Sequence, residues 1–247
     1  MLRIYGRAPT SVTSRMLLLF DIDQTLVTVR DGIGRHVVGN SFAQTFGIDV
    51  TDFLLTFSFA GQTDRAIMAR LADHAGIDAT KADAGWEKYR ALVEQDMLDG
   101  VHSENVDVLP GVRDLVEMLR HDPRYSLGLV TGNIRRIAFH KLGVAGLDHA
   151  FEHGAYGCEH ANRSQLPPLA LHRVNVACNT SFTPADCVVV GDAPNDVQCA
   201  RDNGMACLAV ATGGIDAEQL RQAGAHVVVE SFADVDGVLQ IFESMRG

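Results

Sequence analysis

Short runs of consecutive hydrophobic residues recur along the chain, and each is followed by a polar or glycine-containing turn. The first run, Met16 to Phe20, ends at two carboxylates. Similar runs cover residues 126–130, 187–190, 206–211 and 226–229. A short, continuous apolar run is typical of a strand that is buried on both faces of a parallel sheet, so we predict a strand at each of these places.

Segments with the hydrophobic spacing of helices lie between these runs, and several of them have Pro, Asp or Asn near the first turn. They cover residues 111–121, 134–143, 165–178, 194–203 and 216–223. Strand and helix therefore alternate. This order predicts an α/β fold, with a Rossmann-like, doubly wound parallel sheet and helices on both of its faces.

The stretch from residue 31 to residue 107 breaks this alternation, because it contains no run of the buried-strand type. Its hydrophobic spacing predicts helices near residues 34–47, 63–75 and 83–99. We therefore expect residues 31–107 to form a small all-helical cap domain, and residues 16–30 and 108–247 to form the core. The cap would lie beside the carboxyl end of the first strand, where open α/β sheets bind ligands. Residues 1–15 are expected to be a loose N-terminal extension.

Composition and charge restrict the class of protein. The 247 residues are 47% hydrophobic and 21% charged, which fits a globular chain and not a disordered or fibrous one. The formal net charge of −10 argues against nucleic acid as a partner, since that affinity rests on Lys and Arg. No apolar run approaches the roughly 18 residues of a membrane span. Five cysteines without a CxxC pair indicate reduced thiols and a cytoplasmic protein.

Two pairs of carboxylates follow two of the predicted strands. Asp21 and Asp23 lie two residues apart after the first strand, so their side chains can point the same way. Because two like charges 4 Å apart repel by about 4 kcal/mol at an effective dielectric of 20, a cation is needed there. Asp192 and Asp196 follow a later strand, although Asp192 alone could cap the helix that starts near Pro194. Oxygen-only ligands at two strand ends favour a Mg²⁺ site.

The strand at 126–130 ends in Thr131, Gly132 and Asn133, just before a predicted helix. The free backbone amides and the dipole of a helix N-terminus favour an anion. We therefore expect a phosphate group to bind here, although Thr-Gly-Asn also occurs as an ordinary turn.

In this order, the three elements resemble the motifs of the haloacid dehalogenase superfamily. The segments similar to its first, second and fourth motifs are Asp21-x-Asp23-x-Thr25, Thr131 and Gly191-Asp192-x-x-x-Asp196. The resemblance covers the chain from Met16 onward, and the insertion at 31–107 matches a helical cap. Three further segments are similar to phosphoglycolate phosphatase-like hydrolases: residues 32–35, 61–64 and 163–169.

Two positions depart from the family's pattern. Gln24 stands where the family usually has glycine, which is compatible with the fold if its φ is negative. The third motif usually supplies a lysine. Here Arg163 occupies the comparable place, and an arginine stays charged and can bind phosphate. Lys141 is the alternative cation, but its place on the helix after Thr131 suggests a solvated side chain.

The resemblance implies hydrolysis of a phosphomonoester through an aspartyl-phosphate. Asp21 would be the nucleophile, and Asp23 the general acid and base. Mg²⁺ would be held by Asp21, the backbone carbonyl of Asp23, and Asp192, with Asp196 as a direct or an outer ligand. The oxygens of the phosphate would be bound by Thr131, the amides of Gly132 and Asn133, and Arg163.

The cap would select the substrate, because the core motifs contact only the phosphoryl group. The turn that contains Gly61, Thr63 and Asp64 is the candidate for substrate contact, with the alternative that Thr63 or Asp64 only caps the following helix. Arg35 and Arg65 are candidates for binding a substrate carboxylate, as phosphoglycolate would require.

The sequence thus predicts a magnesium-dependent phosphatase for a small phosphorylated metabolite such as 2-phosphoglycolate, acting as a monomer or homodimer. Two alternatives stay open. A phosphomutase of the β-phosphoglucomutase type would use the same aspartyl-phosphate but return the phosphoryl group to a sugar. A nonenzymatic phosphate-binding module would keep only the fold.

Overall fold

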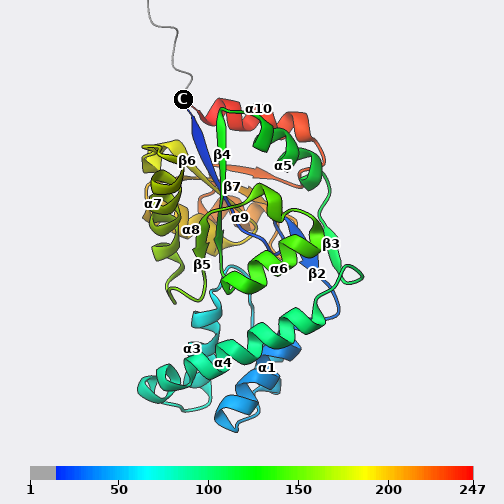
Figure 1. Cartoon of the computed structure of the whole chain (residues 1–247), viewed down its shortest axis with the longest axis vertical. Coiled ribbons are helices and arrows are strands. Elements are labelled where there is room, and N and C mark those ends of the chain that lie inside the picture. The colour runs from blue at the N-terminus through cyan, green and yellow to red at the C-terminus, as the bar shows by residue number, and fades with distance from the viewer. Residues whose placement is uncertain (1–14, 247) are drawn as a thin grey trace, which may run out of the picture.

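The computed structural model describes residues 15–246, which form a six-stranded parallel sheet with helices on both faces and a helical segment beyond one end (Figure 1). The strand order is β5-β4-β1-β6-β7-β8. The strands are β1 Met16–Phe20, β4 Tyr125–Thr131, β5 Gly154–Tyr156, β6 Cys187–Gly191, β7 Ala206–Val210 and β8 Val227–Val229. The predicted α/β class and the five predicted strands are confirmed, and β5 is an additional strand. Residues 1–14 of the expected N-terminal extension lie outside the described residues.

Strand β1 lies in the interior of the sheet, and all five of its residues are buried. Leu17 and Leu19 pack into one cluster of hydrophobic side chains, and Leu18 and Phe20 into another on the opposite face. Helices α7 Leu166–Cys178, α8 Pro194–Asp202 and α9 Ala217–Ala223 contribute to the first cluster. Helices α5 Val112–His121, α6 Arg135–Ala145 and α10 Val235–Met245 contribute to the second. This burial on both faces explains the continuous apolar run.

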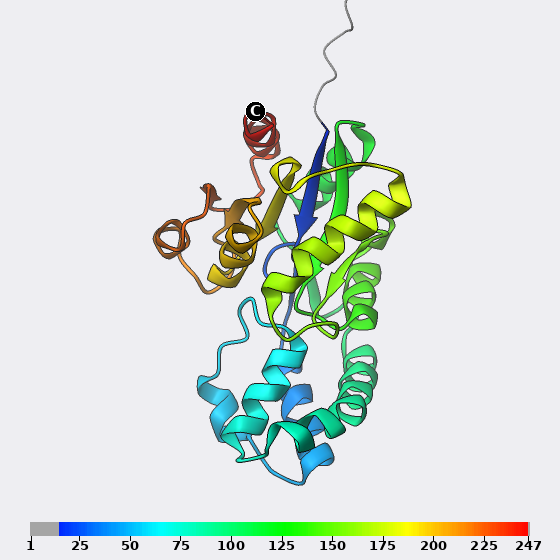
Figure 2. The same ribbon diagram turned by 90° about the vertical axis from the view of Figure 1, so that its left-hand side faces the viewer.

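A group of helices lies beyond the carboxyl ends of the strands (Figures 1 and 2). These helices are α1 Ile33–Phe46, α2 Thr51–Thr56, α3 Asp64–His74 and α4 Ala79–Gly100. They join the rest of the chain next to a two-stranded antiparallel sheet formed by β2 Val27–Val29 and β3 Val106–Val108. Buried aromatic rings connect α1 and α4, since the ring centroids of Phe42 and Tyr89 lie 6.5 Å apart. The three helices expected between residues 31 and 107 are therefore present.

The elements that the sequence does not predict are mostly short. Strands β2, β3 and β5 have three residues each, and α2 has six. Runs of that length carry too little periodicity to be told from loops, and the strands depend on pairing with a neighbour. Helix α10 is also not among the predicted helices, although Val238 and Phe242 are buried at helical spacing.

The turn after β1 does not meet the condition that the sequence analysis set for Gln24. Its φ is +59° and not negative. A left-handed conformation costs a residue with a Cβ about 1–2 kcal/mol. Three hydrogen bonds hold it here. The Gln24 amide donates to the Val27 carbonyl (2.7 Å), its Oε1 accepts from Thr28 Oγ1 (2.7 Å), and its carbonyl accepts from Thr212 Oγ1.

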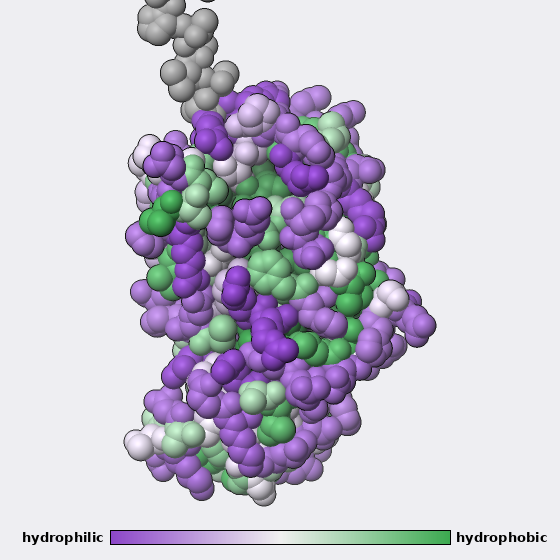
Figure 3. All heavy atoms as spheres, in the orientation of Figure 1, coloured by the Kyte–Doolittle hydropathy of each residue, from purple (hydrophilic) through white to green (hydrophobic). Residues whose placement is uncertain are grey.

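The face in Figure 3 is mostly hydrophilic, with small hydrophobic patches. Large hydrophobic side chains that are exposed are Leu55, Met118, Leu169 and Val176. Within residues 15–246, no helix has the length and apolar character needed to cross a membrane.

Candidate active site

The polar residues at the ends of β1, β4 and β6 lie at one edge of the sheet. Strand β1 is hydrogen-bonded to β4 on one side and to β6 on the other, and Phe20 is level with both Leu129 and Val190. Asp21, Thr131 and Asp192 therefore lie at the carboxyl ends of three adjacent strands. This is the edge at which doubly wound sheets bind their ligands.

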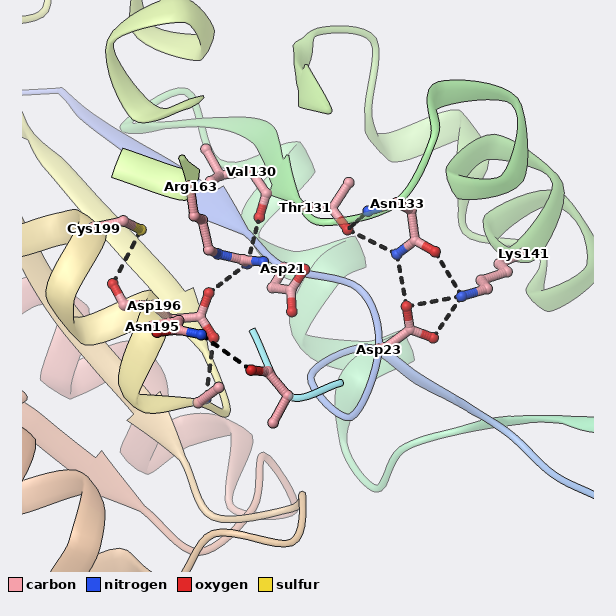
Figure 4. Close-up of polar contacts among 12 residues, drawn as sticks. Asp21, Asp23, Val130, Thr131, Asn133, Lys141, Arg163, Asn195, Asp196 and Cys199 are labelled. Atoms are coloured by element: carbon pink, nitrogen blue, oxygen red, sulfur yellow. Dashed lines mark hydrogen bonds and ion pairs between the residues drawn. The ribbon is translucent and has the colours of Figure 1, made fainter. Parts of the chain in front are cut away.

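Asp21, Asp192 and Asp196 form a cluster of three buried carboxylates, here called the carboxylate cluster. One oxygen of each lies within 4.8 Å of the others, and none of the three residues is more than 5% exposed. The buried Arg163 lies against two of them (Figure 4). Its Nη2 is 2.5 Å from Asp196 Oδ1 and 3.2 Å from Asp21 Oδ1. The three carboxylates of the cluster therefore share the charge of one guanidinium, which contacts two of them directly.

Burial and the charges of neighbouring carboxylates oppose ionisation of Asp192 and Asp196. Burial, followed by the charges of Asp196 and Asp21, raises the pKa of Asp192 to about 8. Burial also raises the pKa of Asp196 to about 6, although the Arg163 guanidinium lowers it. Burial works against the charge of Arg163, but Asp196 and Asp21 outweigh it and raise the pKa of Arg163. Of these two carboxylates, Asp192 has the higher pKa, and a further cation would favour its charged form.

The donor set of the carboxylate cluster fits Mg²⁺. It consists of carboxylate oxygens, which hard divalent cations prefer, whereas zinc and copper sites are richer in thiolate and imidazole. The side chain of Asp23 does not belong to the cluster. Asp23 could then contribute to a metal site through its backbone carbonyl, which is the contribution that the family resemblance implies.

Asp23 has a separate set of partners (Figure 4). Lys141 Nζ lies 2.7 and 2.8 Å from its two carboxylate oxygens, and Asn133 Nδ2 donates to Oδ2 at 2.6 Å. Lys141 also donates to Asn133 Oδ1 at 2.7 Å. The side chain of Lys141 is only 6% exposed, so the expectation of a solvated lysine is wrong. Its two partners, the negatively charged Asp23 and the polar Asn133, compensate for the burial of the Lys141 ammonium group.

Thr131 and Asn133 are buried next to Asp23, but part of the expected phosphate site is already occupied by protein groups. Thr131 Oγ1 accepts from the Asn133 amide at 3.3 Å and from Asn133 Nδ2 at 2.9 Å. The next amide, that of Ile134, donates to Asp64 Oδ2 at 2.7 Å. Asn133 therefore links Thr131, Asp23 and Lys141 through its side chain, a role that the sequence did not indicate.

The turn that contains Gly61, Thr63 and Asp64, here called the specificity turn, directly contacts the segments that follow β4 and β6. The Asp64 amide donates to the Gly132 carbonyl at 2.8 Å. A Cβ on Gly132 would lie 1.9 Å from the Gln62 carbonyl oxygen, so only glycine allows this approach. Gly61 has a φ of +62°, and a Cβ there would lie 2.6 Å from Asn195 Cβ. The turn is thus held against the ends of β4 and β6.

Thr63 and Asp64 have different functions in this turn. Thr63 Oγ1 accepts from the Ala66 amide at 3.1 Å and so caps α3, which is the simpler of the two predicted alternatives. The same hydroxyl donates to the Ala161 carbonyl at 2.9 Å. Asp64 does not cap the helix, and burial raises the pKa of its carboxyl group to about 6.

A cavity of about 300 Å³ lies between the sheet edge and the α1, α3 and α4 helices. The predicted site residues that line it are Asp21, Asp23, Gly61, Asp64, Gly132, Asn133, Arg163 and Asp192. Thr63, Thr131 and Asp196 are not part of the lining. Thr131 is bonded to Asn133 and Asp196 to Arg163, and both of these partners line the cavity. Lys141 and Arg35 also line the cavity. Arg65 does not, because it pairs with Asp83 at 3.2 Å and stacks on Trp86.

Comparisons with known proteins agree with this architecture. The model of a family described as haloacid dehalogenase-like hydrolase matches residues 18–210. A 5'-nucleotidase of Pseudomonas aeruginosa is 27% identical, over 92% of this chain and 95% of its own length. A phosphoglycolate phosphatase of Chromobacterium violaceum is 29% identical, over 87% of this chain and 92% of its own length. The crystal structure of a predicted phosphatase from Clostridium acetobutylicum has the same fold, with a TM-score of 0.68, 22% identity, and coverage of 92% of this chain and 99% of that chain.

Proposed function

The chain belongs to the haloacid dehalogenase-like hydrolase family, and we propose that it is a magnesium-dependent phosphatase that hydrolyses a small-metabolite phosphomonoester through an aspartyl-phosphate. The reaction class, hydrolysis of phosphoric monoesters, agrees with the names of the 5'-nucleotidase and the phosphoglycolate phosphatase to which the chain is similar.

The observation that carries this proposal is the different environment of two carboxylates that lie two residues apart. Asp21 belongs to the carboxylate cluster and contacts Arg163. Asp23 lines the same cavity but is bound by Lys141 and Asn133, and its side chain is 40% exposed. A nucleophile and a proton-transferring group need such separate surroundings, because one must stay ionised while the other changes its protonation state.

In the first step, a carboxylate oxygen of Asp21 attacks the phosphorus atom in line with the ester oxygen. The P–O bond to the leaving group breaks, and Asp23 gives its proton to the departing alkoxide. Lys141 and Asn133 keep Asp23 in position.

In the second step, Asp23 accepts a proton from the water molecule that attacks the aspartyl-phosphate. The P–O bond to Asp21 breaks and inorganic phosphate leaves. Arg163 and the backbone amide of Gly132 are proposed to hold the phosphate oxygens that do not react, because the Asn133 amide already donates to Thr131 Oγ1.

Asp21, Asp192 and the backbone carbonyl of Asp23 would hold Mg²⁺, with Asp196 bonded to Arg163 beside them. When bound, Mg²⁺ would offset the negative charge of the carboxylates, which otherwise repels an anionic substrate. Two features support the site: the carboxylate-only donor set, and a pKa of Asp192 raised to about 8 by burial and by its acidic neighbours.

The test is release of inorganic phosphate, with and without Mg²⁺, from p-nitrophenyl phosphate, 2-phosphoglycolate, sugar phosphates and nucleoside monophosphates. We expect release that depends on Mg²⁺ and that is lost in Asp21→Asn, a variant that preserves the shape of the side chain. Circular dichroism controls for its fold. A near-normal rate in Asp21→Asn would refute the nucleophile assignment, and isomerisation of a sugar phosphate faster than phosphate release would favour a phosphomutase.

A further inference from the structure

We propose that the substrate of this phosphatase carries an apolar organic group with a carboxylate at its far end, and that Arg35 binds this carboxylate. The proposal rests on the proposed function and specifies its substrate class. It depends on three observations about the cavity: a guanidinium nitrogen without a partner, a largely apolar wall, and polar side chains that are already bonded within the protein.

The first observation concerns the Arg35 side chain on α1. Its Nη1 atom is buried and has no hydrogen-bond partner among residues 15–246. Its Nη2 donates to the Phe57 carbonyl at 3.3 Å, and the guanidinium lies over the Phe59 ring at 5.0 Å from its centroid. Arg35 lines the cavity. A buried charged donor without a partner is costly, and a carboxylate is the acceptor that fits a guanidinium best.

Arg35 is also the cation best available to a second anionic group. Of the described residues between 31 and 107 that line the cavity, Arg35 is the only basic one. The other cations of the lining are bound to carboxylates, Lys141 to Asp23 and Arg163 to Asp21 and Asp196. An anion at the far end of a substrate would therefore reach Arg35 without competing with an existing ion pair.

The second observation concerns the wall of the cavity that is formed mainly by helices α1, α3 and α4. Its side chains are mainly hydrophobic and come from α1, α3, α4, α6 and the segment before α3. They are Val38, Phe59, Ile67, Val93, Met97 and Ile137. Burial of apolar substrate atoms against this wall is favourable, at about a fourfold gain in affinity for each methylene group.

The third observation concerns polar side chains that line the cavity. Gln62 Nε2 donates to the Ser58 carbonyl at 2.5 Å, and Asp64 Oδ2 accepts from the Ile134 amide. Gln24 Oε1 accepts from Thr28. A substrate rich in hydroxyl groups, such as a sugar phosphate, would have to compete with these bonds for three of the polar atoms of the cavity. Together with the hydrophobic side chains of the wall, this favours an apolar chain over a sugar.

The experiment compares two series of phosphomonoesters in the presence of Mg²⁺. One is the ω-carboxyalkyl phosphates, which begin with 2-phosphoglycolate and lengthen by one methylene at a time. The other is the n-alkyl phosphates of equal length. We expect kcat/KM to rise by about fourfold per added methylene until the cavity is filled. At the best length, kcat/KM of the ω-carboxyalkyl phosphate should exceed that of the n-alkyl phosphate of equal length by about tenfold to a hundredfold.

Variants of Arg35 identify the residue responsible. Arg35→Gln should lower kcat/KM for the ω-carboxyalkyl phosphates about tenfold to a hundredfold more than for the n-alkyl phosphates, and Arg35→Lys should keep part of the preference. Arg70→Gln is the matched control, because Arg70 lies over Phe57 at 5.1 Å just as Arg35 lies over Phe59, but is exposed and outside the cavity lining. It should behave as the wild type.

The outcomes separate the proposals. Equal rates for both series, or a carboxylate preference that survives Arg35→Gln, would overturn the role of Arg35 while leaving the phosphatase intact. If sugar phosphates were the best substrates, this would overturn the proposal that the substrate carries an apolar group. No hydrolysis of any ester, including p-nitrophenyl phosphate, would instead contradict the proposed function itself.

Discussion

Replacing Lys141 with methionine tests whether this side chain positions Asp23. Methionine is similarly long and unbranched but uncharged, so the substitution removes the cation while filling most of its space. Lys141 Nζ contacts both carboxylate oxygens of Asp23, at 2.7 and 2.8 Å, and Asn133 Oδ1 at 2.7 Å. After the change, Asp23 keeps the hydrogen bond from Asn133 Nδ2 at 2.6 Å and becomes less firmly oriented.

The stability of the Lys141→Met variant should change moderately. Asn133 is 8% exposed, so its Oδ1 loses a donor at a cost of about 1–3 kcal/mol. The Asp23 side chain is 40% exposed, so water replaces part of what it loses. Methionine also needs no desolvation of a charge. We expect the free energy of unfolding to fall by about 1–2 kcal/mol, with the fold intact.

The activity should change more than the stability. A general acid or base contributes about 10²–10⁴ to the rate, and a poorly oriented one loses part of that. We expect kcat to fall by about tenfold to a hundredfold with little change in KM. The assay is phosphate release by the wild type, Lys141→Met, Asp23→Asn and the double variant. If Lys141 acts through Asp23, the double variant should be no slower than Asp23→Asn within about twofold.

Arg135→Met is the matched control, because Arg135 is an exposed cation on the same helix and does not line the cavity. It should keep the kcat of the wild type. Two results would refute the reasoning: a wild-type kcat in Lys141→Met, or fully additive losses in the double variant with Asp23→Asn.

Three further predictions follow from the charges and the backbone of the site. Because the folded-state pKa of Asp192 is raised from 3.8 to about 8, the metal-free protein should lose stability as the pH rises between these two values. Mg²⁺ should therefore raise the melting temperature more at pH 8 than at pH 6. Equal shifts of the melting temperature at the two pH values would contradict this. Arg163→Ala leaves the buried carboxylates of Asp21 and Asp196 without their cation, so the free energy of unfolding in EDTA should fall by about 3–5 kcal/mol. Part of this loss should be recovered when Mg²⁺ is added. If Mg²⁺ had no effect on urea unfolding of the variant, this would argue against the metal site. Gly61→Ala should destabilise the protein more than Gly76→Ala. Both glycines have a positive φ, but only a Cβ on Gly61 would meet Asn195. Equal melting temperatures of the two variants would show that the close approach of Gly61 to Asn195 is unimportant.

The fold and the carboxylate cluster could be predicted because they depend on simple local patterns. Met16–Phe20 is buried on both faces of the sheet, and this is the environment that a continuous apolar run indicates. Asp21 and Asp192 follow such runs directly. Since the carboxyl ends of parallel strands meet at one edge, the two residues could be expected to lie together before the order of the strands was known.

The interactions of Lys141 and of the specificity turn were harder to predict. The burial of Lys141 has a signal in the sequence, because it falls at the helical spacing of the buried residues Ile137, Ala138, Leu142 and Ala145. Its partner Asp23, however, lies 118 residues away and depends on how α6 packs beside the end of β1. The left-handed Gln24 is likewise held by Thr212, which is 188 residues away. Local patterns do not encode such pairings.

The order of the strands explains how one strand end can supply two carboxylates with different chemistry. Asp21 and Asp23 both follow β1, which lies between β6 and β4. The segment after β6 supplies Asp192 from the loop and Asp196 from the first turn of α8, and both carboxylates lie close to that of Asp21. The segment after β4 supplies Asn133 and Lys141, which bind Asp23. Because the two neighbours of β1 bring opposite kinds of partner, alternate residues of one short segment are suited to a metal-assisted nucleophile and to a proton-transfer group.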